Sequence, residues 1–215
     1  RDPSKSRGLG DVYKRQQALW DYKVIFFRNQ EITSEEQLRF AQRFGELEIH
    51  PFLPPNTKTP ELVRFEKNAN AAGYENQWHH DVTWRETPSQ GAILRAIEIP
   101  PIGGDTLFVD ANAAYEGLTQ EMKDEIDSLN AVHDFLRAFG RQVPKEKLAE
   151  MREMYPLVKH PVVINHHQTG KPLLYVNRIF VNGIEGYDEK EGFELIDALC
   201  LSLIHISEPT RLAWI

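Results

Sequence analysis

The segment "QWHHDVTW" (residues 77–84) carries side chains that could bind a metal ion. If the segment is a β-strand, residues two apart point to the same face, so His79 and Asp81 lie on one face and His80 on the other. An imidazole and a carboxylate on one face can bind a divalent ion at adjacent corners of an octahedron. A further histidine would complete the two-histidine, one-carboxylate site of non-haem iron(II) enzymes, which leaves positions open for a cosubstrate and dioxygen.

The triplet also fits other interpretations. A lone histidine in a core is more often a hydrogen-bonded structural residue than a ligand. A zinc site needs four protein ligands, or three and a water, and the sequence has a single cysteine. A metal hydrolase that used His79, His80 and Asp81 would need further histidine or carboxylate ligands at close spacing, and the sequence offers no such cluster.

The elements that must position this segment can be predicted from hydrophobic periodicity. Short apolar runs bounded by turn residues predict β-strands, and two pairs of them are typical of hairpins, joined by "PPIGG" and by "HHQTG". The predicted strands cover residues 22–30, 61–65, 91–99, 105–110, 160–165 and 171–177, and a loop with four prolines covers residues 51–60.

Other segments have the period of an amphipathic helix. The first follows Thr33, which can form a capping box with Glu36. In the second, a stripe of apolar side chains runs from Leu118 to Leu129. The predicted helices cover residues 33–45, 118–129, 145–154 and 188–199.

Short strands in the middle of the chain with helices around them predict a mainly β fold, a sandwich or barrel with flanking helices. The sequence has no internal repeat and no linker, so residues 17–199 are expected to form one domain. Residues 1–16 and 200–215 have no period that continues into their neighbours, and both resemble translated sequencing adapters. We interpret them as non-native tails.

Composition and charge narrow the classes of partner. With 25 basic and 32 acidic residues the formal charge is −7, which disfavours nucleic acid and anionic lipid. No apolar run is long enough to cross a bilayer, and a single cysteine is typical of a reducing compartment. The sequence therefore predicts a cytoplasmic enzyme without nucleic acid or membrane partners, and it is compatible with a homo-oligomer.

Longer stretches around the histidine segment resemble a known family. "WHHDVTW" followed by "ETPSQGAILRAIEIPPIGGDTLF", with "VIFFRNQ", "LRFAQRFGELEIHP", "AAYEGL", "HDF" and "HPVV" in the same order, resembles the taurine dioxygenase family over nearly all of residues 17–199. These iron(II)- and 2-oxoglutarate-dependent dioxygenases include enzymes for aryloxyalkanoates and alkyl sulfates. The resemblance implies a double-stranded β-helix, a cupin-like jelly roll, that is incomplete at the C-terminus.

The resemblance also implies roles for individual residues. His79 and Asp81 match the first two iron ligands, and Thr106 matches a threonine that contacts the carboxylate of 2-oxoglutarate. His50 matches a histidine that contacts the anionic group of the substrate. For the aromatic residues of the implied substrate pocket, core packing is the stronger interpretation without the resemblance. The implied pocket residues are His50, Val82, Phe139 and Phe180.

The implied reaction couples decarboxylation of 2-oxoglutarate to succinate with hydroxylation of a small organic acid by dioxygen. For a sulfonate such as taurine, hydroxylation beside the sulfonate releases sulfite and an aldehyde. Leu53 stands where taurine dioxygenase has a tyrosine, and Glu75 where it has an asparagine. Leu53 removes a polar group and Glu75, if it points inward, favours a cation, so these two departures predict a substrate other than taurine itself. The expected substrate is a sulfonate or another small anionic organic acid.

Two functional residues of the family have no match in this chain. The third iron ligand is a distal histidine, and an arginine that pairs with 2-oxoglutarate follows it; His205 and Arg211 do not resemble that motif. We therefore expect the parent protein to be an enzyme and this fragment to be inactive, since it lacks a bidentate anchor for the cosubstrate. The alternatives are a non-catalytic jelly-roll binding protein and a dioxygenase for a sulfate ester or an aryloxyalkanoate.

Overall fold

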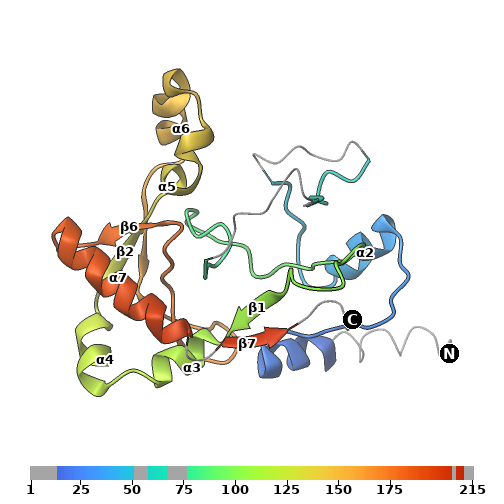
Figure 1. Cartoon of the computed structure of the whole chain (residues 1–215), viewed down its shortest axis with the longest axis horizontal. Helices are drawn as coiled ribbons and strands as arrows, with labels where there is room; N and C mark the ends of the chain where they lie inside the picture. The colour runs from blue at the N-terminus through green and yellow to red at the C-terminus, as the bar shows by residue number, and fades with distance from the viewer. Residues whose placement is uncertain (1–13, 51–57, 67–76, 205–206, 211–215) are drawn as a thin grey trace. The chain divides into compact units, whose positions relative to one another are not determined.

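The computed structural model describes residues 14–50, 58–66, 77–204 and 207–210 (Figure 1). The chain divides into two compact units. The first unit comprises residues 1–75, 91–105 and 211–215, and the second comprises residues 76–90 and 106–210. Within the described ranges, we find no helix whose length and apolar character would let it cross a membrane.

In the first unit, helix α2 (Ser34–Ala41) begins as predicted. Glu36 N donates to Thr33 Oγ1, and Thr33 N donates to the Glu36 carboxylate, which are the two reciprocal bonds of a capping box. The ring of Phe40 on this helix packs edge to face against Phe27, with 5.3 Å between the ring centroids. The apolar run before the helix therefore contributes side-chain packing to this unit.

The strands predicted at residues 22–30 and 61–65 are wrong. Residues 14–22 are helical, and residues 24–28 and 62–66 have no strand assignment. Lys23 (φ 63°) and Asn29 (φ 54°) adopt left-handed conformations, which interrupt an extended segment at both ends. Apolar runs of this length do not distinguish a strand from a segment that packs only through its side chains.

Of the two strands predicted for the first hairpin, one is confirmed and the other is wrong. Strand β1 (Thr106–Val109) forms as predicted, but residues 91–99 are not a strand and belong to the other unit. The connection at residues 100–104 has two prolines without an N–H and two glycines at φ 76° and 72°, so it does not continue a ladder. Strand β1 pairs instead, antiparallel, with β7 (Ser207–Thr210).

Two further sheets lie in the second unit. Strand β2 (Asn130–His133) pairs antiparallel with β3 (Val158–Pro161) on one side and with β6 (Val181–Ile184) on the other. Strands β4 (Val163–Asn165) and β5 (Pro172–Leu174) form the second predicted hairpin. The described residues thus combine small antiparallel sheets with helices, and the closed jelly roll stays a prediction.

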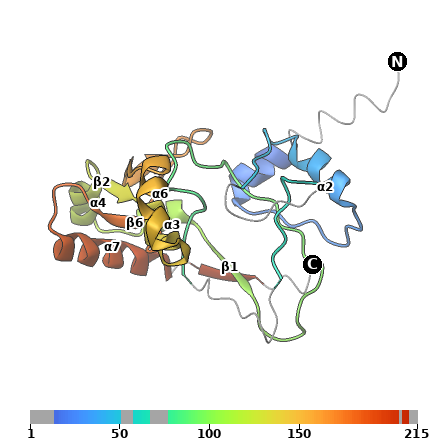
Figure 2. The same ribbon diagram turned by 90° about the horizontal axis from the view of Figure 1, so that it is seen from above.

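The helices predicted in the second unit are confirmed as α4 (Gln120–Ile126), α6 (Leu148–Met154) and α7 (Glu189–Ile204). Figures 1 and 2 both show α7 running beside β6. The remaining helices are α3 (Ala111–Glu116), α5 (Phe135–Phe139) and the short 3-10 turns η1 (Gly140–Gln142) and η2 (Lys145–Lys147).

Helix α7 packs its apolar face into the core of the second unit. Ile196 and Leu199 are fully buried and lie in one hydrophobic cluster with Ile126 of α4. The helix continues past residue 199 and also buries Cys200, and this burial raises the pKa of the Cys200 thiol to about 11. The start of the segment 200–215 is therefore part of the packed helix, and its non-native origin stays a prediction.

Asp134 joins two helices of the second unit, so its removal should destabilise the fold. Its Oδ1 accepts from Leu136 N at 2.7 Å and caps α5, and both of its oxygens lie 2.8 Å from the guanidinium of Arg152 on α6. We expect Asp134→Ala to lower the free energy of unfolding by about 2–4 kcal/mol, since a cap and one partner of a part-buried ion pair are lost together. Urea unfolding measures this loss. Asp134→Asn keeps a cap acceptor and should lose less; equal losses would contradict the contribution of the cap.

Candidate functional site

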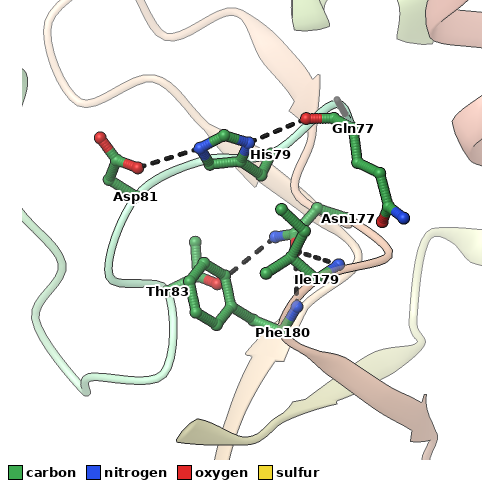
Figure 3. A network of polar contacts seen from close by, with 7 residues as sticks. All are labelled: Gln77, His79, Asp81, Thr83, Asn177, Ile179 and Phe180. Carbon is green, nitrogen blue, oxygen red and sulfur yellow. Dashed lines mark hydrogen bonds and ion pairs between the residues drawn. The ribbon is translucent and has the colours of Figure 1, made fainter. Parts of the chain in front are cut away.

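His79 and Asp81 lie side by side at the surface of the second unit (Figure 3). His79 Nε2 is 3.2 Å from Asp81 Oδ1, and His79 Nδ1 is 2.9 Å from the backbone oxygen of Gln77. The Asp81 side chain is 69% exposed and the His79 side chain 32%. An imidazole and a carboxylate are therefore together, accessible to a ligand from solvent.

The Gln77 carbonyl determines which nitrogen of His79 is available for binding. A carbonyl oxygen only accepts, so His79 Nδ1 donates to it. In the neutral form of the ring Nε2 then carries the lone pair that faces Asp81, and in the protonated form Nε2 donates to Asp81 Oδ1 as an ion pair. Two acceptors at 3.2 Å repel unless a proton or another cation neutralises them. Metal-binding histidines are oriented in the same way, with the second ring nitrogen donating to a carbonyl or carboxylate. The donor set thus fits a divalent metal.

The backbone around this pair is a turn, so the predicted strand at residues 77–84 is wrong. Residues 81–84 form the turn, in which Arg85 N donates to Val82 O at 3.1 Å. Val82 is 7% exposed and has φ 49°, a left-handed conformation that is strained for a β-branched residue by about 1–3 kcal/mol. His79 and Asp81 therefore meet through a strained turn, although strand alternation was the reason for expecting them together.

His80 has a different environment from this pair, packed against an aromatic ring. Its ring lies 5.1 Å from the ring of Tyr175, and its Nδ1 is buried without a hydrogen-bond partner among the described residues. Burial, together with the neighbouring His79, lowers the pKa of His80 to about 4. No group of three metal-binding side chains occurs in the part of the chain that the structure describes, so the hydrolase interpretation gains no support.

The predicted substrate-pocket residues are brought together only in part. Phe139 at the end of α5 and Phe180 before β6 lie with their ring centroids 6.1 Å apart, and both belong to the same unit as Val82. Phe180 is 5% exposed and Phe139 is half-buried. This placement is compatible with a pocket wall and with core packing, so the role of these residues stays a prediction.

The other predicted residues are placed as follows. Thr106 is the first residue of β1 and is half-buried. His50 is half-buried in the first unit, so its grouping with the metal site stays a prediction. Leu53 and Glu75, on which the expected substrate preference rested, lie outside the described residues.

Sequence reasoning missed the buried polar residues behind the turn. Thr83 is fully buried, and its hydroxyl lies 2.9 Å from Nδ1 of His133 and 3.4 Å from Nδ2 of Asn177. His160 Nε2 lies 2.9 Å from the backbone oxygens of both Thr83 and Arg85. The available signal was the position of Thr83, two residues after a candidate ligand, whereas nothing local marks Asn177.

Comparison with known proteins identifies relatives of the chain. The "Alkylsulfatase" of Acinetobacter baylyi is 32% identical over 92% of this chain and 64% of its own length. The "Alpha-ketoglutarate-dependent sulfate ester dioxygenase" of Pseudomonas putida is 32% identical over 93% of this chain and 68% of its own length. A crystal structure of a putative alpha-ketoglutarate-dependent taurine dioxygenase from Burkholderia xenovorans superposes with a TM-score of 0.78 at 28% identity, over 94% of this chain and 69% of that one.

The chain thus spans about two thirds of the length of these relatives. The sequence profile of a single family, described as "Taurine catabolism dioxygenase TauD, TfdA family", matches residues 6–203, which include the histidine turn and both sides of it. A match over most of the chain, with relatives at 32% identity, shows that this chain belongs to the taurine catabolism dioxygenase family.

Proposed function

We propose that this chain is the part of a 2-oxoglutarate-dependent dioxygenase that supplies two of its iron(II) ligands. The side-chain pair His79 and Asp81 carries the proposal, because Nε2 and Oδ1 converge at 3.2 Å on a solvent-accessible turn. The Gln77 carbonyl holds His79 in the tautomer that a metal requires. A third histidine ligand from the same full-length protein completes the proposed site.

The residues of this chain would do three things in the reaction. His79 and Asp81 would hold the metal on one side of the site, and Thr106 would donate its hydroxyl to a carboxylate of 2-oxoglutarate. Val82, Phe139 and Phe180 would exclude water from the substrate. When bound, iron(II) and 2-oxoglutarate supply the oxidation by which one atom of dioxygen enters a C–H bond and the other enters succinate.

We further propose a small substrate that carries a sulfonate or sulfate group, with His50 contacting the anion. Two relatives at 32% identity support this class, because their names refer to alkyl sulfates or sulfate esters. Sulfonates and sulfate esters can be distinguished by the product that each of them releases. Hydroxylation of the carbon that bears a sulfonate releases sulfite and an aldehyde, whereas hydroxylation of the carbon that bears a sulfate ester releases sulfate and an aldehyde.

The test uses the protein expressed from its gene with the natural downstream sequence. Succinate, sulfite and sulfate are measured with iron(II), 2-oxoglutarate and oxygen on a panel of alkyl sulfonates, alkyl sulfates and aryloxyalkanoates. We expect succinate with either sulfite or sulfate, and no product without oxygen. Succinate formed only with aryloxyalkanoates would replace the proposed substrate class but keep the reaction. No succinate with any substrate would refute the dioxygenase and favour a binding protein.

A further inference from the structure

A buried polar contact lies behind the turn that presents Asp81 (Figure 3). The turn has two features that require support from elsewhere: a carboxylate that is mostly exposed and the strained backbone of Val82. Thr83 follows directly and is 0% exposed. A strained turn keeps its conformation only where the surrounding structure determines it, and Thr83 makes polar contacts with three residues of other elements.

Thr83 is held at both its side chain and its backbone. Its hydroxyl accepts from Asn177 Nδ2 and forms a second hydrogen bond with Nδ1 of His133 on β2. Its backbone oxygen accepts from Nε2 of His160 on β3, a nitrogen shared with the backbone oxygen of Arg85. Two paired strands and one loop thus fix the residue two positions after Asp81.

Asn177 links Thr83 to Phe180, one of the proposed substrate-binding residues. Its Oδ1 accepts from Phe180 N at 2.8 Å and from Ile179 N at 3.1 Å, while its Nδ2 donates to Thr83 (Figure 3). The same side chain is fully buried. One amide therefore connects the turn that carries the proposed metal ligand with the backbone that carries Phe180.

We infer that Thr83 is a positioning residue. Through Asn177 it fixes the position of Asp81 relative to Phe180, and so the position of the bound metal relative to the substrate. The inference rests on the proposed function, since it assumes that Asp81 binds the metal. Removing the Thr83 hydroxyl should affect metal affinity and also the coupling of the reaction, defined as the fraction of succinate formed together with oxidised substrate. A purely structural hydroxyl would change stability alone.

The test compares Thr83→Val with Thr83→Ser in the protein expressed with its natural downstream sequence. Valine keeps the shape of threonine without the hydroxyl, whereas serine keeps the hydroxyl. We expect Thr83→Val to weaken Mn(II) binding about 10- to 100-fold, as loss of a group that supports a metal ligand does, and to lower the coupling. Thr83→Ser should restore both. Titration calorimetry with Mn(II) gives the affinity independently of turnover.

Thr119→Val serves as the matched control for lost stability. Thr119 Oγ1 accepts from Met122 N as the N-cap of α4 in the same unit, so its replacement costs about 0.5–2 kcal/mol without touching the turn. Mn(II) affinity and coupling should be unchanged in Thr119→Val. Equal losses in Thr83→Val and Thr119→Val would overturn the inference, and so would wild-type affinity and coupling in Thr83→Val.

Two further variants keep the outcome decisive. If Thr83→Val does not fold, the double variant Thr83→Val with His133→Phe replaces it. This variant removes both partners of the 2.9 Å contact, so neither of these two groups is left unsatisfied. The same losses of Mn(II) affinity and coupling are expected.

His79→Ala separates the inference from the proposed function. Mn(II) binding that persists in His79→Ala refutes the metal site and the inference together. Binding that is lost in His79→Ala but intact in Thr83→Val refutes the inference alone.

Discussion

Replacing His79 with alanine should weaken divalent metal binding by more than about a hundredfold. Loss of a partner that only supports a ligand costs about 10- to 100-fold, and His79→Ala removes the ligand itself. The same variant should form no succinate above background. The physical reason is that Asp81 would then be the one side chain of this turn left to bind the metal, and this side chain is 69% exposed to solvent. Mn(II) titration calorimetry of the protein with its natural downstream sequence measures the effect.

The matched control for His79→Ala is His167→Ala. His167 is an exposed histidine in the turn between β4 and β5, and its ring stacks on His166 at 5.1 Å. Such a pair could bind metal adventitiously, so the control measures that contribution. We expect His167→Ala to bind Mn(II) like the wild type. If His167→Ala loses binding while His79→Ala retains it, the metal site has been assigned to the wrong histidines.

The second large effect concerns stability in acid. His133 is fully buried, and this burial, together with His160 and His80, lowers the pKa of His133 to about 3. In the unfolded chain the side chain titrates near 6.5. Between these values the unfolded state binds more protons than the folded state, so stability falls as the pH is lowered and is unaffected by His133 above this window. The loss is about 1.4 kcal/mol for each pH unit inside the window.

Polar and aromatic side chains from neighbouring elements face His133. They are the hydroxyl of Thr83, the rings of His160 and Tyr175, and His80, whose charge also acts on it. We expect His133→Asn to reduce the slope of unfolding free energy against pH by about 1.4 kcal/mol per unit between about pH 6 and pH 4. Urea unfolding at a series of pH values measures it. His167→Asn, in an exposed turn, should leave the slope as in the wild type, and an unchanged slope in His133→Asn would contradict the prediction.

Local sequence patterns predicted the helices and one hairpin well. The capping box of Thr33 and Glu36, the apolar stripe of α4 and the turn between β4 and β5 all depend on residues close together in the chain. The strands predicted at 22–30, 61–65 and 91–99 did not form, because a strand also needs a partner backbone. Apolar content alone does not specify that partner.

The sequence by itself determined that His79 and Asp81 lie close together, since only one residue separates them, and that His80 differs from them in environment. It also determined the family, through motifs spread over most of the chain. Only the tertiary structure decided how the pair is presented. A strained turn at Val82 replaces the expected strand, and Thr83 is held by His133 and Asn177, which are 50 and 94 residues away. Contacts over such separations follow from how strands and loops pack, and no local pattern encodes them.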